Sequence, residues 1–422
     1  MKGGKRFYPP ELYKMKKIAL LIISLFLTLH TAFAIEDTAS SEEVVLDFPA
    51  EEEEVDNTIH DELEELGYET VPEHSEIQKE KTLREKLEDI YHLEVKDIDK
   101  NNFLLTDIVT KHFSEDSIIK SIHPFAGYNE NLNFIFNQSD SFQTKYGFNA
   151  VNVGFDGVFK NDVADFRFLT SFQPLSHRNM VRNLFSDVYV GTNKIPQHRV
   201  QVGYQRPGNG MEGKISAYQI PFLYRSQISR NFGTVRKIGA RVIGDYSLIE
   251  YDIGGYSSDT YMKSFFPGAE FDGWVNFKPL GKTNGKYGKL KIGGGIQGGK
   301  RHTDYFLTGA YVSYEYKKFM VDFEWANANG YNGSSGHVSD KHAGGFYTTV
   351  SYRLTPKVQL LARYDQFDPD RHVRHNSKRE YSLGINYFIK GPGLRLIFNY
   401  IFCQNDAAKD SHRLMVGTQI LL

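Results

Sequence analysis

The feature that most constrains this fold is an alternation of apolar and polar residues, which recurs from about residue 120 to the carboxyl terminus. In one segment the apolar residues occupy every second position: Leu394, Leu396, Phe398, Tyr400 and Phe402. Arg395 and Asn399 lie between them. A period of two predicts a β-strand with one apolar and one polar face. A series of such strands suits a wall between lipid and water.

The connections between these segments alternate in length. Counting back from the carboxyl terminus, tight turns at 390–393, 355–356 and 317–318 alternate with longer loops at 405–411, 368–378 and 328–342. Outer-membrane barrels have short periplasmic turns and longer outer loops, so the last strand is expected to end in the periplasm. The outer connection at 300–303 is short and breaks this rule.

Extended to the whole alternating region, the pattern gives sixteen strands. They are 122–137, 145–158, 163–173, 184–193, 198–206, 235–243, 248–257, 270–279, 288–299, 304–317, 318–327, 343–354, 357–367, 379–389, 393–404 and 412–422. Bacterial barrels have even strand numbers, and sixteen strands enclose an aqueous channel. We therefore predict an all-β fold, a transmembrane antiparallel β-barrel of about 16 strands over residues 114–422.

The composition agrees with a barrel and argues against a bundle of membrane helices. Mean hydropathy is −0.44, although barrel strands average out as polar. Aromatic residues make up 14% of the chain and there are 37 glycines, which fits a barrel with aromatic girdles. A soluble all-β sandwich is the alternative. Cys403 is the only cysteine, so no internal disulfide can form.

Residues 1–34 are a predicted leader and signal peptide. A cationic start at 16–17 precedes an apolar stretch at 18–29, and a small-x-small cleavage site ends at Ala34. The apolar stretch is too short to span a bilayer comfortably, so cleavage is expected rather than anchoring. Met1 and Met15 are both candidate start residues.

The next segments differ in charge from the barrel. Residues 35–113 contain 25 Asp/Glu and 7 Lys/Arg, whereas 114–422 contain 26 Asp/Glu and 37 Lys/Arg. Residues 35–72 are acidic and poor in large apolar side chains, which predicts disorder. Residues 73–113 are a predicted periplasmic helical segment, because four apolar residues have near-helical spacing: Ile77, Leu83, Leu87 and Ile90. It is either a solvated linker helix or one helix of an oligomeric coiled coil.

Three stretches carry a family resemblance. Residues 362–370, Ala-Arg-Tyr-Asp-Gln-Phe-Asp-Pro-Asp, resemble a run of the phosphate-selective porin family, porins O and P. Residues 218–226 are similar to its Ile-Pro-Phe loop, and residues 273–279 resemble one of its strands. The resemblance implies a trimer of sixteen-stranded pores for inorganic anions. The chain departs from the pattern at Leu422, where barrels usually end in Phe, and in its acidic amino-terminal segment.

The longest connection, 207–234, is the third outer loop of the predicted barrel and contains Lys214, Arg225 and Arg230. General porins fold their third loop into the pore, so by resemblance this segment is the candidate constriction loop. The alternative is a loop that projects outward as part of a vestibule.

The alternation also assigns the faces of the wall, with Leu360 expected toward lipid and Gln359 toward the lumen. Eleven cations are expected to point inward: Arg167, Arg199, Lys237, Arg241, Lys278, Lys289, Lys291, Arg353, Arg363, Arg395 and Arg413. Five anions share that side: Asp156, Asp245, Asp322, Glu324 and Asp365. The candidate anion-binding set is Arg225 and Arg230 with the wall residues Lys237, Arg241, Lys278, Lys289, Lys291, Arg353, Arg363 and Arg395. An excess of cations favours anions, unless the charges pair across strands.

No motif favours an enzyme. His372 and His375 follow three aspartates of the same loop region, but a solvated outer loop is the favoured interpretation over a metal site. The glycines of residues 293–299 lie within a strand pattern and indicate close backbone packing rather than a phosphate loop. We expect no catalytic residues, cofactor, metal or nucleic-acid partner.

These features predict a porin of the bacterial outer membrane, open to passive diffusion of small solutes and preferring anions such as phosphate. Its expected partners are outer-membrane lipid, small anions and, by resemblance, two further copies of itself. The competing hypothesis is a barrel that transports nothing and serves as an adhesin or envelope anchor.

Overall fold

The computed structural model describes residues 110–137, 142–172, 184–233, 235–260, 264–333 and 338–422. The predicted leader, the acidic segment and almost all of the predicted helical segment lie outside these residues. The last residues of that segment, Lys111–His112, form a short strand, β1, and not a helix. Among the described residues, no helix combines the length and apolar character needed to cross a bilayer.

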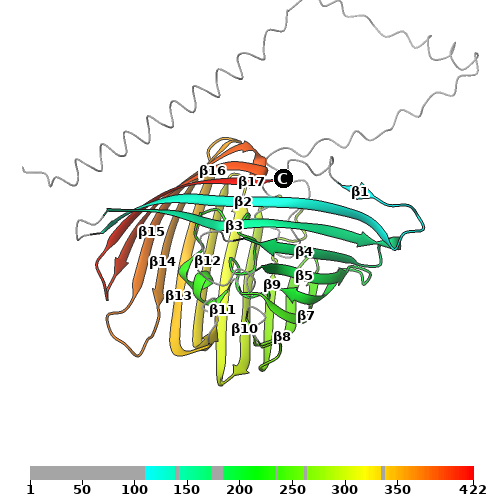
Figure 1. The fold of residues 1–422 in the computed structure, drawn as a ribbon. Helices are drawn as coiled ribbons and strands as arrows, with labels where there is room; N and C mark the ends of the chain where they lie inside the picture. The colour runs from blue at the N-terminus through cyan, green and yellow to red at the C-terminus, as the bar shows by residue number, and fades with distance from the viewer. Residues whose placement is uncertain (1–109, 138–141, 173–183, 234, 261–263, 334–337) are drawn as a thin grey trace, which may run out of the picture. The chain divides into compact units, whose positions relative to one another are not determined.

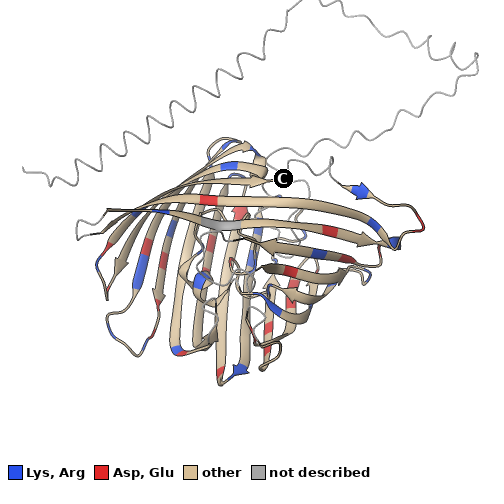
Figure 2. Ribbon diagram, viewed as in Figure 1, with Lys and Arg blue, Asp and Glu red and all other residues tan. Residues whose placement is uncertain are grey.

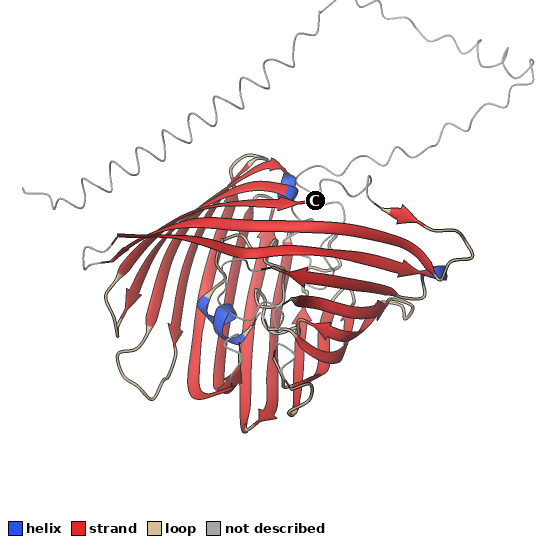
Figure 3. Ribbon diagram, viewed as in Figure 1, coloured by secondary structure: helices blue, strands red, loops and turns tan. Residues whose placement is uncertain are grey.

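The described elements are nearly all strands (Figure 3). After β1 come β2 (Ile119–Asn137), β3 (Phe142–Phe159), β4 (Asp165–Ser171), β5 (Phe185–Thr192), β6 (His198–Gln205), β7 (Lys237–Asp245), β8 (Ile249–Ser257), β9 (Ala269–Phe277), β10 (Lys289–Arg301), β11 (Thr303–Tyr316), β12 (Phe319–Asn332), β13 (Val338–Arg353), β14 (Val358–Asp368), β15 (Lys378–Lys390), β16 (Leu394–Asn405) and β17 (Ser411–Leu421). The helical elements are η2 (Lys160–Asp162), α5 (Gln227–Phe232) and η4 (Gly391–Gly393).

Strands β2 to β17 form one closed antiparallel ring (Figure 1). Each strand pairs with the next, and β17 closes the ring by pairing with β2, with Leu421 opposite Gly127. Leu422 extends this seam through two reciprocal backbone hydrogen bonds with Ala126 of 2.8 and 2.9 Å. The sixteen predicted strands are confirmed, with ends that shift by a few residues. The predicted all-β transmembrane barrel is therefore confirmed.

The short predicted outer connection at 300–303 is a single residue, His302. Arg301 and Thr303 pair directly across it. His302 adopts a φ of 68°, in the left-handed region that a tight reversal of the chain requires. One left-handed residue therefore replaces the long loop that the alternation in lengths predicts at this position.

The two faces of the wall follow the alternation of the sequence. In β9 the side chains of Glu270, Asp272 and Trp274 are buried inside the barrel, while Phe271 and Val275 are exposed outside it. The same holds in β14, where Leu360 is 39% exposed and Gln359 is 1% exposed. The predicted faces of these two residues are confirmed. Gln359 is nevertheless packed, with its Oε1 accepting a hydrogen bond of 3.1 Å from Asn386.

A row of aromatic rings crosses the outer face of the barrel, from the short-turn end of β12 to the loop ends of β2 and β3. Its rings come from successive strands: Phe323, Phe346, Tyr364, Tyr381, Phe402, His412, Phe136 and Phe142. Ring centroids lie 5.1 Å apart for Tyr364 and Tyr381 and 4.8 Å apart for Phe402 and His412. Because the strands of such barrels are tilted, directly paired residues lie at different heights, and this row runs obliquely across the membrane-facing surface.

The cost of a charge on the membrane-facing surface should depend on its depth in the bilayer. Ala362→Arg, which places a charge on the exposed outer face near the middle of β14, should destabilise the barrel by roughly 2–4 kcal/mol. Leu354→Arg, at an exposed residue of the turn after β13, should cost about 0–1 kcal/mol, since water reaches the membrane edge. Urea unfolding of the two proteins in lipid vesicles measures the difference. Equal losses would mean that β14 does not face hydrocarbon.

Candidate functional site: the lumen and its inward loop

The connection between β6 and β7, residues 206–236, lies inside the barrel. It corresponds to the predicted third outer loop and includes the short helix α5 (Figure 3). The Tyr218 hydroxyl donates to Asn152 of β3 at 2.8 Å, and the backbone N–H of Leu223 donates to Asn399 of β16 at 2.8 Å. Asn399 is a buried, inward-facing residue of its strand. The loop thus contacts widely separated parts of the inner wall.

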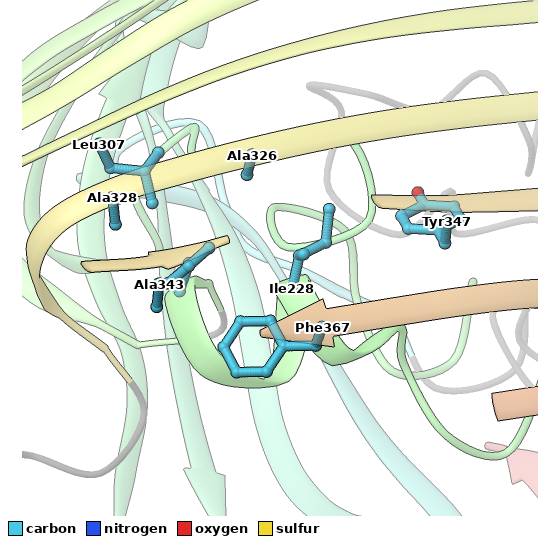
Figure 4. Packing of buried hydrophobic residues seen from close by; sticks show 8 residues of the cluster. Ile228, Leu307, Ala326, Ala328, Ala343, Tyr347 and Phe367 are labelled. Atoms are coloured by element: carbon cyan, nitrogen blue, oxygen red, sulfur yellow. The ribbon is translucent and has the colours of Figure 1, made fainter. Parts of the chain in front are cut away.

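Apolar side chains fix this loop where the wall is also apolar. Ile228 and Phe232 of α5 pack on a patch contributed by β11 to β14 (Figure 4). The patch consists of Leu307, Ala326, Ala328, Ala343, Tyr347 and Phe367. Leu223 packs on Ile397, Ile401, Cys403 and Met415 of β16 and β17. Burial of these side chains holds the loop against the wall.

Two wall glycines make room for the loop. A Cβ atom at Gly127 of β2 would collide with the ring of Tyr218, and one at Gly417 of β17 would collide with the Leu223 side chain. Both glycines occupy inward positions at which other strand residues carry larger side chains. A glycine in a strand often marks such a close approach.

Carboxylates of the wall accept hydrogen bonds from the loop backbone. Glu324 of β12 accepts from the N–H of Met211 at 2.8 Å and from that of Glu212 at 3.3 Å, and the Tyr347 hydroxyl donates to it at 2.8 Å. Asp365 of β14 accepts from the N–H of Gln227 at 2.6 Å. These carboxylates therefore anchor the loop as hydrogen-bond acceptors for its backbone N–H groups.

Arg363 bonds to both the loop and the wall. Its guanidinium donates to Glu212 Oε1 at 2.5 Å, to Thr349 Oγ1 at 2.8 Å and to the Tyr224 carbonyl at 3.2 Å. It also lies over the ring of Phe222, 4.6 Å from the centroid. This arginine joins β14 to the loop at two points and is itself buried.

Arg395 and Arg230 make similar connections between wall and loop. Arg395 of β16 donates to the Ile220 carbonyl at 2.8 Å and to Gln419 Oε1 at 2.8 Å. Arg230 of α5 donates to Glu380 of β15 at 2.8 Å. With Arg363, these residues show that part of the predicted anion-binding set holds the loop in place.

A second group of arginines gathers at the base of the loop. Arg206 lies within electrostatic range of Arg225, Arg236 and Arg241, and of the Asp187 carboxylate. We call the four arginines the base arginines. Arg236 pairs with Asp187 at 2.7 Å, and Arg241 lies 3.3 Å from Asp252.

The other two base arginines are held by the backbone. Arg225 donates to the Ile215 carbonyl at 2.6 Å, and Arg206 donates to the same oxygen. Arg225 also donates to the Glu212 carbonyl. A backbone carbonyl orients a guanidinium without cancelling its charge, so the base arginines combine two carboxylate-bound and two carbonyl-bound cations.

The predicted lysines lie elsewhere. Lys278, Lys289 and Lys291 line a cavity of about 540 Å³ near the turn between β9 and β10, together with Asp245 and Glu250. Lys278 lies 2.5 Å from Asp245, and Lys291 lies 3.2 Å from Glu250. Lys289 is exposed to this space.

Lys237 and Arg353 are distant from the lysine cavity. Lys237 is fully buried and paired with Glu270 of β9. Glu270 also accepts from Tyr305 at 2.5 Å and from Gln297 at 2.9 Å. Arg353 lies over the Phe388 ring, 4.5 Å from its centroid, and bonds to the Pro356 carbonyl near the turn after β13. The structure therefore divides the predicted set into several groups.

The predicted excess of inward cations on the wall is wrong, because eight further carboxylates join the five predicted and bring the inward anions to thirteen, against eleven predicted cations. Further carboxylates lie on the inner side of the described strands: Asp165, Asp187, Glu250, Asp252, Glu270, Asp272, Glu315 and Glu380. Cross-strand pairs occur, such as Arg167 with Asp156 at 2.7 Å and Arg199 with Asp165 at 2.6 Å. Figure 2 shows the acidic and basic residues interspersed along the strands.

Some of these residues had a usable signal in the sequence. Glu250 and Asp252 alternate with Ile249, Tyr251 and Ile253, which places them inward by the rule used for the cations. Arg206 and Arg236 lie at the ends of the predicted strands 198–206 and 235–243, where the alternation assigns them to the outer face. In the structure both stand just outside β6 and β7, where the alternation no longer applies.

The described residues contain no cluster of three or more His, Cys, Asp or Glu that could hold a metal ion. His372 of the outer loop instead lies against His342 of β13, with the ring centroids 4.4 Å apart.

Comparison with known proteins agrees with this architecture. Residues 294–421 match the family described as phosphate-selective porin O and P. The family resemblance found in the sequence is confirmed, and the match includes the stretch 362–370 but not 218–226 or 273–279. The match covers β11 to β17 and most of β10, and includes Arg363 and Arg395. No curated protein matches the chain.

Solved structures show the same fold at low sequence identity. An anion-selective porin from Comamonas acidovorans has a TM-score of 0.52 and 11% identity, over 71% of this chain and 99% of that chain. OprB from Pseudomonas putida has a TM-score of 0.55 and 10% identity, over 71% and 94%. The outer membrane channel DcaP of Acinetobacter baumannii has a TM-score of 0.52 and 10% identity, over 74% and 100%. The chain is a porin-like outer-membrane barrel.

The buried pair of Arg363 and Glu212 should be essential for holding the loop. Arg363→Met leaves the Glu212 carboxylate buried without its partner, a change that costs roughly 3–5 kcal/mol in other proteins. The barrel is closed by its own backbone, so the loss should appear as faster tryptic cleavage within residues 206–236.

Arg379→Met is the matched control. Arg379 pairs with Asp406 at 2.9 Å on the outer surface, where both side chains are partly exposed. Loss of such a pair is worth about 0–1 kcal/mol. Equal cleavage rates in the two variants would show that the Arg363 pair does not hold the loop.

Proposed function

We propose that this barrel is a channel for passive diffusion of small anions, and that the base arginines set its preference. The observation that carries the proposal is the gathering of Arg206, Arg225, Arg236 and Arg241 where the loop leaves the wall. A guanidinium fork can bind two oxygens of a phosphate or carboxylate at once. Asp187 and Asp252 pair with two of the four arginines, and the Glu212 carboxylate near Arg225 is itself paired with Arg363, so the group retains an excess of positive charge.

The position of the base arginines supports a role in selectivity. Charges act most strongly on a permeating ion where water is scarce and the path is narrow. Loop 206–236 occupies part of the lumen and narrows the route left for ions. The base arginines lie beside this narrowed part. The lysine cavity near the β9–β10 turn adds further cations at the end of the barrel that contains the chain's carboxyl terminus.

Phosphate is the anion that the family match favours. We propose it as the preferred solute, with the outer membrane as the location and a homotrimer as the assembly. We also place the acidic and helical segments before residue 110 in the periplasm, because β2 starts at the end of the barrel where β17 finishes.

The competing function is that of a closed barrel acting as an adhesin or envelope anchor. Burial of the lumen favours it, since Lys237, Asn386 and Gln419 have no exposed surface. Single-channel recording separates the two functions. A diffusion channel gives stepwise conductance in a planar bilayer, whereas a closed barrel gives none.

Neutralising the two carbonyl-bound base arginines tests whether they set the anion preference. We expect Arg206→Gln with Arg225→Gln to lower the anion preference strongly, since these positive charges lie in poorly screened surroundings. The measurement is the zero-current potential under a KCl gradient.

Arg371→Gln with Arg374→Gln removes the same charge from an exposed outer loop and serves as the control. Its shift should be much smaller, because salt screens exposed charges. Shifts of equal size in the zero-current potential would show that the selectivity is not set at loop 206–236.

Phosphate binding makes a separate prediction. Inorganic phosphate added to a channel conducting chloride should reduce the single-channel current and reach saturation, since a bound oxyanion blocks the path. The Arg206 and Arg225 double variant should lose this block. A current that changes in simple proportion to phosphate concentration would argue for a general anion channel without a phosphate site.

A further inference from the structure

The connection between β9 and β10 differs from the other connections at the short-turn end of the barrel. It spans eleven residues, 278–288. The other connections at this end span five residues or fewer: 160–164, 193–197, 246–248, 317–318, 354–357 and 391–393. Outer-membrane barrels keep their periplasmic turns short, so a connection of this length at this end requires an explanation. We call residues 278–289 the basic turn.

The basic turn carries only positive charges. Lys278, Lys282, Lys286 and Lys289 belong to it, and residues 278–291 contain no Asp or Glu. Lys278 is paired within the lysine cavity. The other three lysines are exposed, and none of them pairs with a carboxylate of the described residues. The turn therefore presents three unneutralised cations to the surroundings of this end of the barrel.

The basic turn is held in one conformation by its own backbone. The N–H groups of Gly281, Thr283 and Lys286 donate to carbonyls three residues earlier, at 2.9 to 3.0 Å. A Cβ atom at Gly281 would overlap the Ser247 carbonyl, so the turn packs directly on the connection between β7 and β8. A turn fixed in this way is a preformed surface, and little ordering cost opposes binding to it.

An exposed cationic surface suits an anionic partner, and the chain itself contains one. Residues 88–99 lie outside the described residues, and their sequence has five acidic residues against one lysine. The acidic residues are Glu88, Asp89, Glu94, Asp97 and Asp99. The charge of this segment is therefore opposite to that of the basic turn, and the two attract each other most strongly at low ionic strength.

The length of the chain lets this segment reach the basic turn. The described chain starts at Thr110, and β1 pairs with the start of β2, so the preceding segment joins the barrel at the short-turn end. β10 is the eighth strand after β2 in a ring of sixteen, so the basic turn lies across the mouth from that point. Strands about 4.8 Å apart and tilted near 45° give a barrel roughly 35 Å wide. Asp99 is twelve residues before Lys111, and an extended chain of that length spans about 40 Å.

We propose that residues 88–99 bind the basic turn of the same chain. This proposal rests on the periplasmic position proposed above for the segment. Its carboxylates pair with Lys282, Lys286 and Lys289. Each exposed ion pair is weak, but the tether holds the segment at an effective concentration of about a millimolar, so several pairs act together. The bound segment places negative charge beside the lysine cavity and lowers the positive potential of that mouth.

Zero-length cross-linking tests the contact. A carbodiimide joins a lysine amine to a carboxylate only when the two touch, and mass spectrometry of the peptides then identifies the joined residues. In the purified full-length protein at low salt, we expect amide links from Lys282 or Lys286 to residues 88–99. Raising KCl to about 1 M should lower the yield of these links about fivefold or more, because the Debye length falls to about 3 Å.

A neighbouring turn supplies the matched control. Lys317 and Lys318 are exposed at the same end of the barrel, in the connection between β11 and β12. Lys282→Gln with Lys286→Gln should lower the total yield of links to residues 88–99 several-fold. Lys317→Gln with Lys318→Gln removes the same charge and should leave that yield unchanged.

Other results would overturn the proposal. Equal losses in the two double variants would show that any exposed lysine at this end serves, and an absence of links would show that there is no contact. Links from the basic turn only to residues 35–72 would assign the surface to a different segment. Links found only between labelled and unlabelled chains, in a mixture of isotope-labelled and ordinary protein, would place the contact between copies. The base arginines are tested by conductance, so failure of this contact is distinguishable from failure of the channel proposal.

Discussion

Closure of the backbone hydrogen-bond ring is the constraint on which the rest of this structure depends. In hydrocarbon no water is present to hydrogen-bond an unpaired backbone N–H or C=O group. A β-sheet can therefore cross a membrane only when it has no open edge strand. The pairing of β17 with β2 removes the last edge and continues through Leu422. With the backbone closed in this way, the inner side chains of the barrel are free to hold the inserted loop 206–236.

The insertion of loop 206–236 changes the demands on the inner wall. A wall that faced only water would tolerate unpaired charges, whereas a wall covered by a loop must pair or hydrogen-bond them. The pairs Arg363–Glu212 and Lys237–Glu270 are buried on both sides and meet that demand. Apolar contacts of Leu223 and Ile228 occupy the places where the wall itself is apolar. The loop and the wall are therefore complementary in charge as well as in shape.

The periodicity of the sequence predicts the strands well, because each outward residue must suit lipid and each inward residue need not. That requirement applies to every strand, as the outward Leu360 and the inward Gln359 show. No such rule governs the loop. Arg206 and Arg225 are nineteen positions apart in the sequence, and both donate to the Ile215 carbonyl. Only the folded path of the loop brings them together, so no sequence pattern predicts this contact. The acids at Glu250 and Asp252 followed the periodic rule, and an equal search for anions and cations would have found them.

For the proposed anion preference, the distinction between two kinds of arginine partner is the physical basis in a lumen with many carboxylates. A carboxylate partner fixes a guanidinium and cancels its charge, as Asp187 does for Arg236. A carbonyl partner fixes it equally well but contributes only a dipole, which leaves the positive charge acting on the path. Ile215 supplies one carbonyl to two arginines, and Glu212 supplies another to Arg225. In the proposed channel, selectivity is therefore governed less by the total of inward charges than by which of them are held by backbone carbonyls.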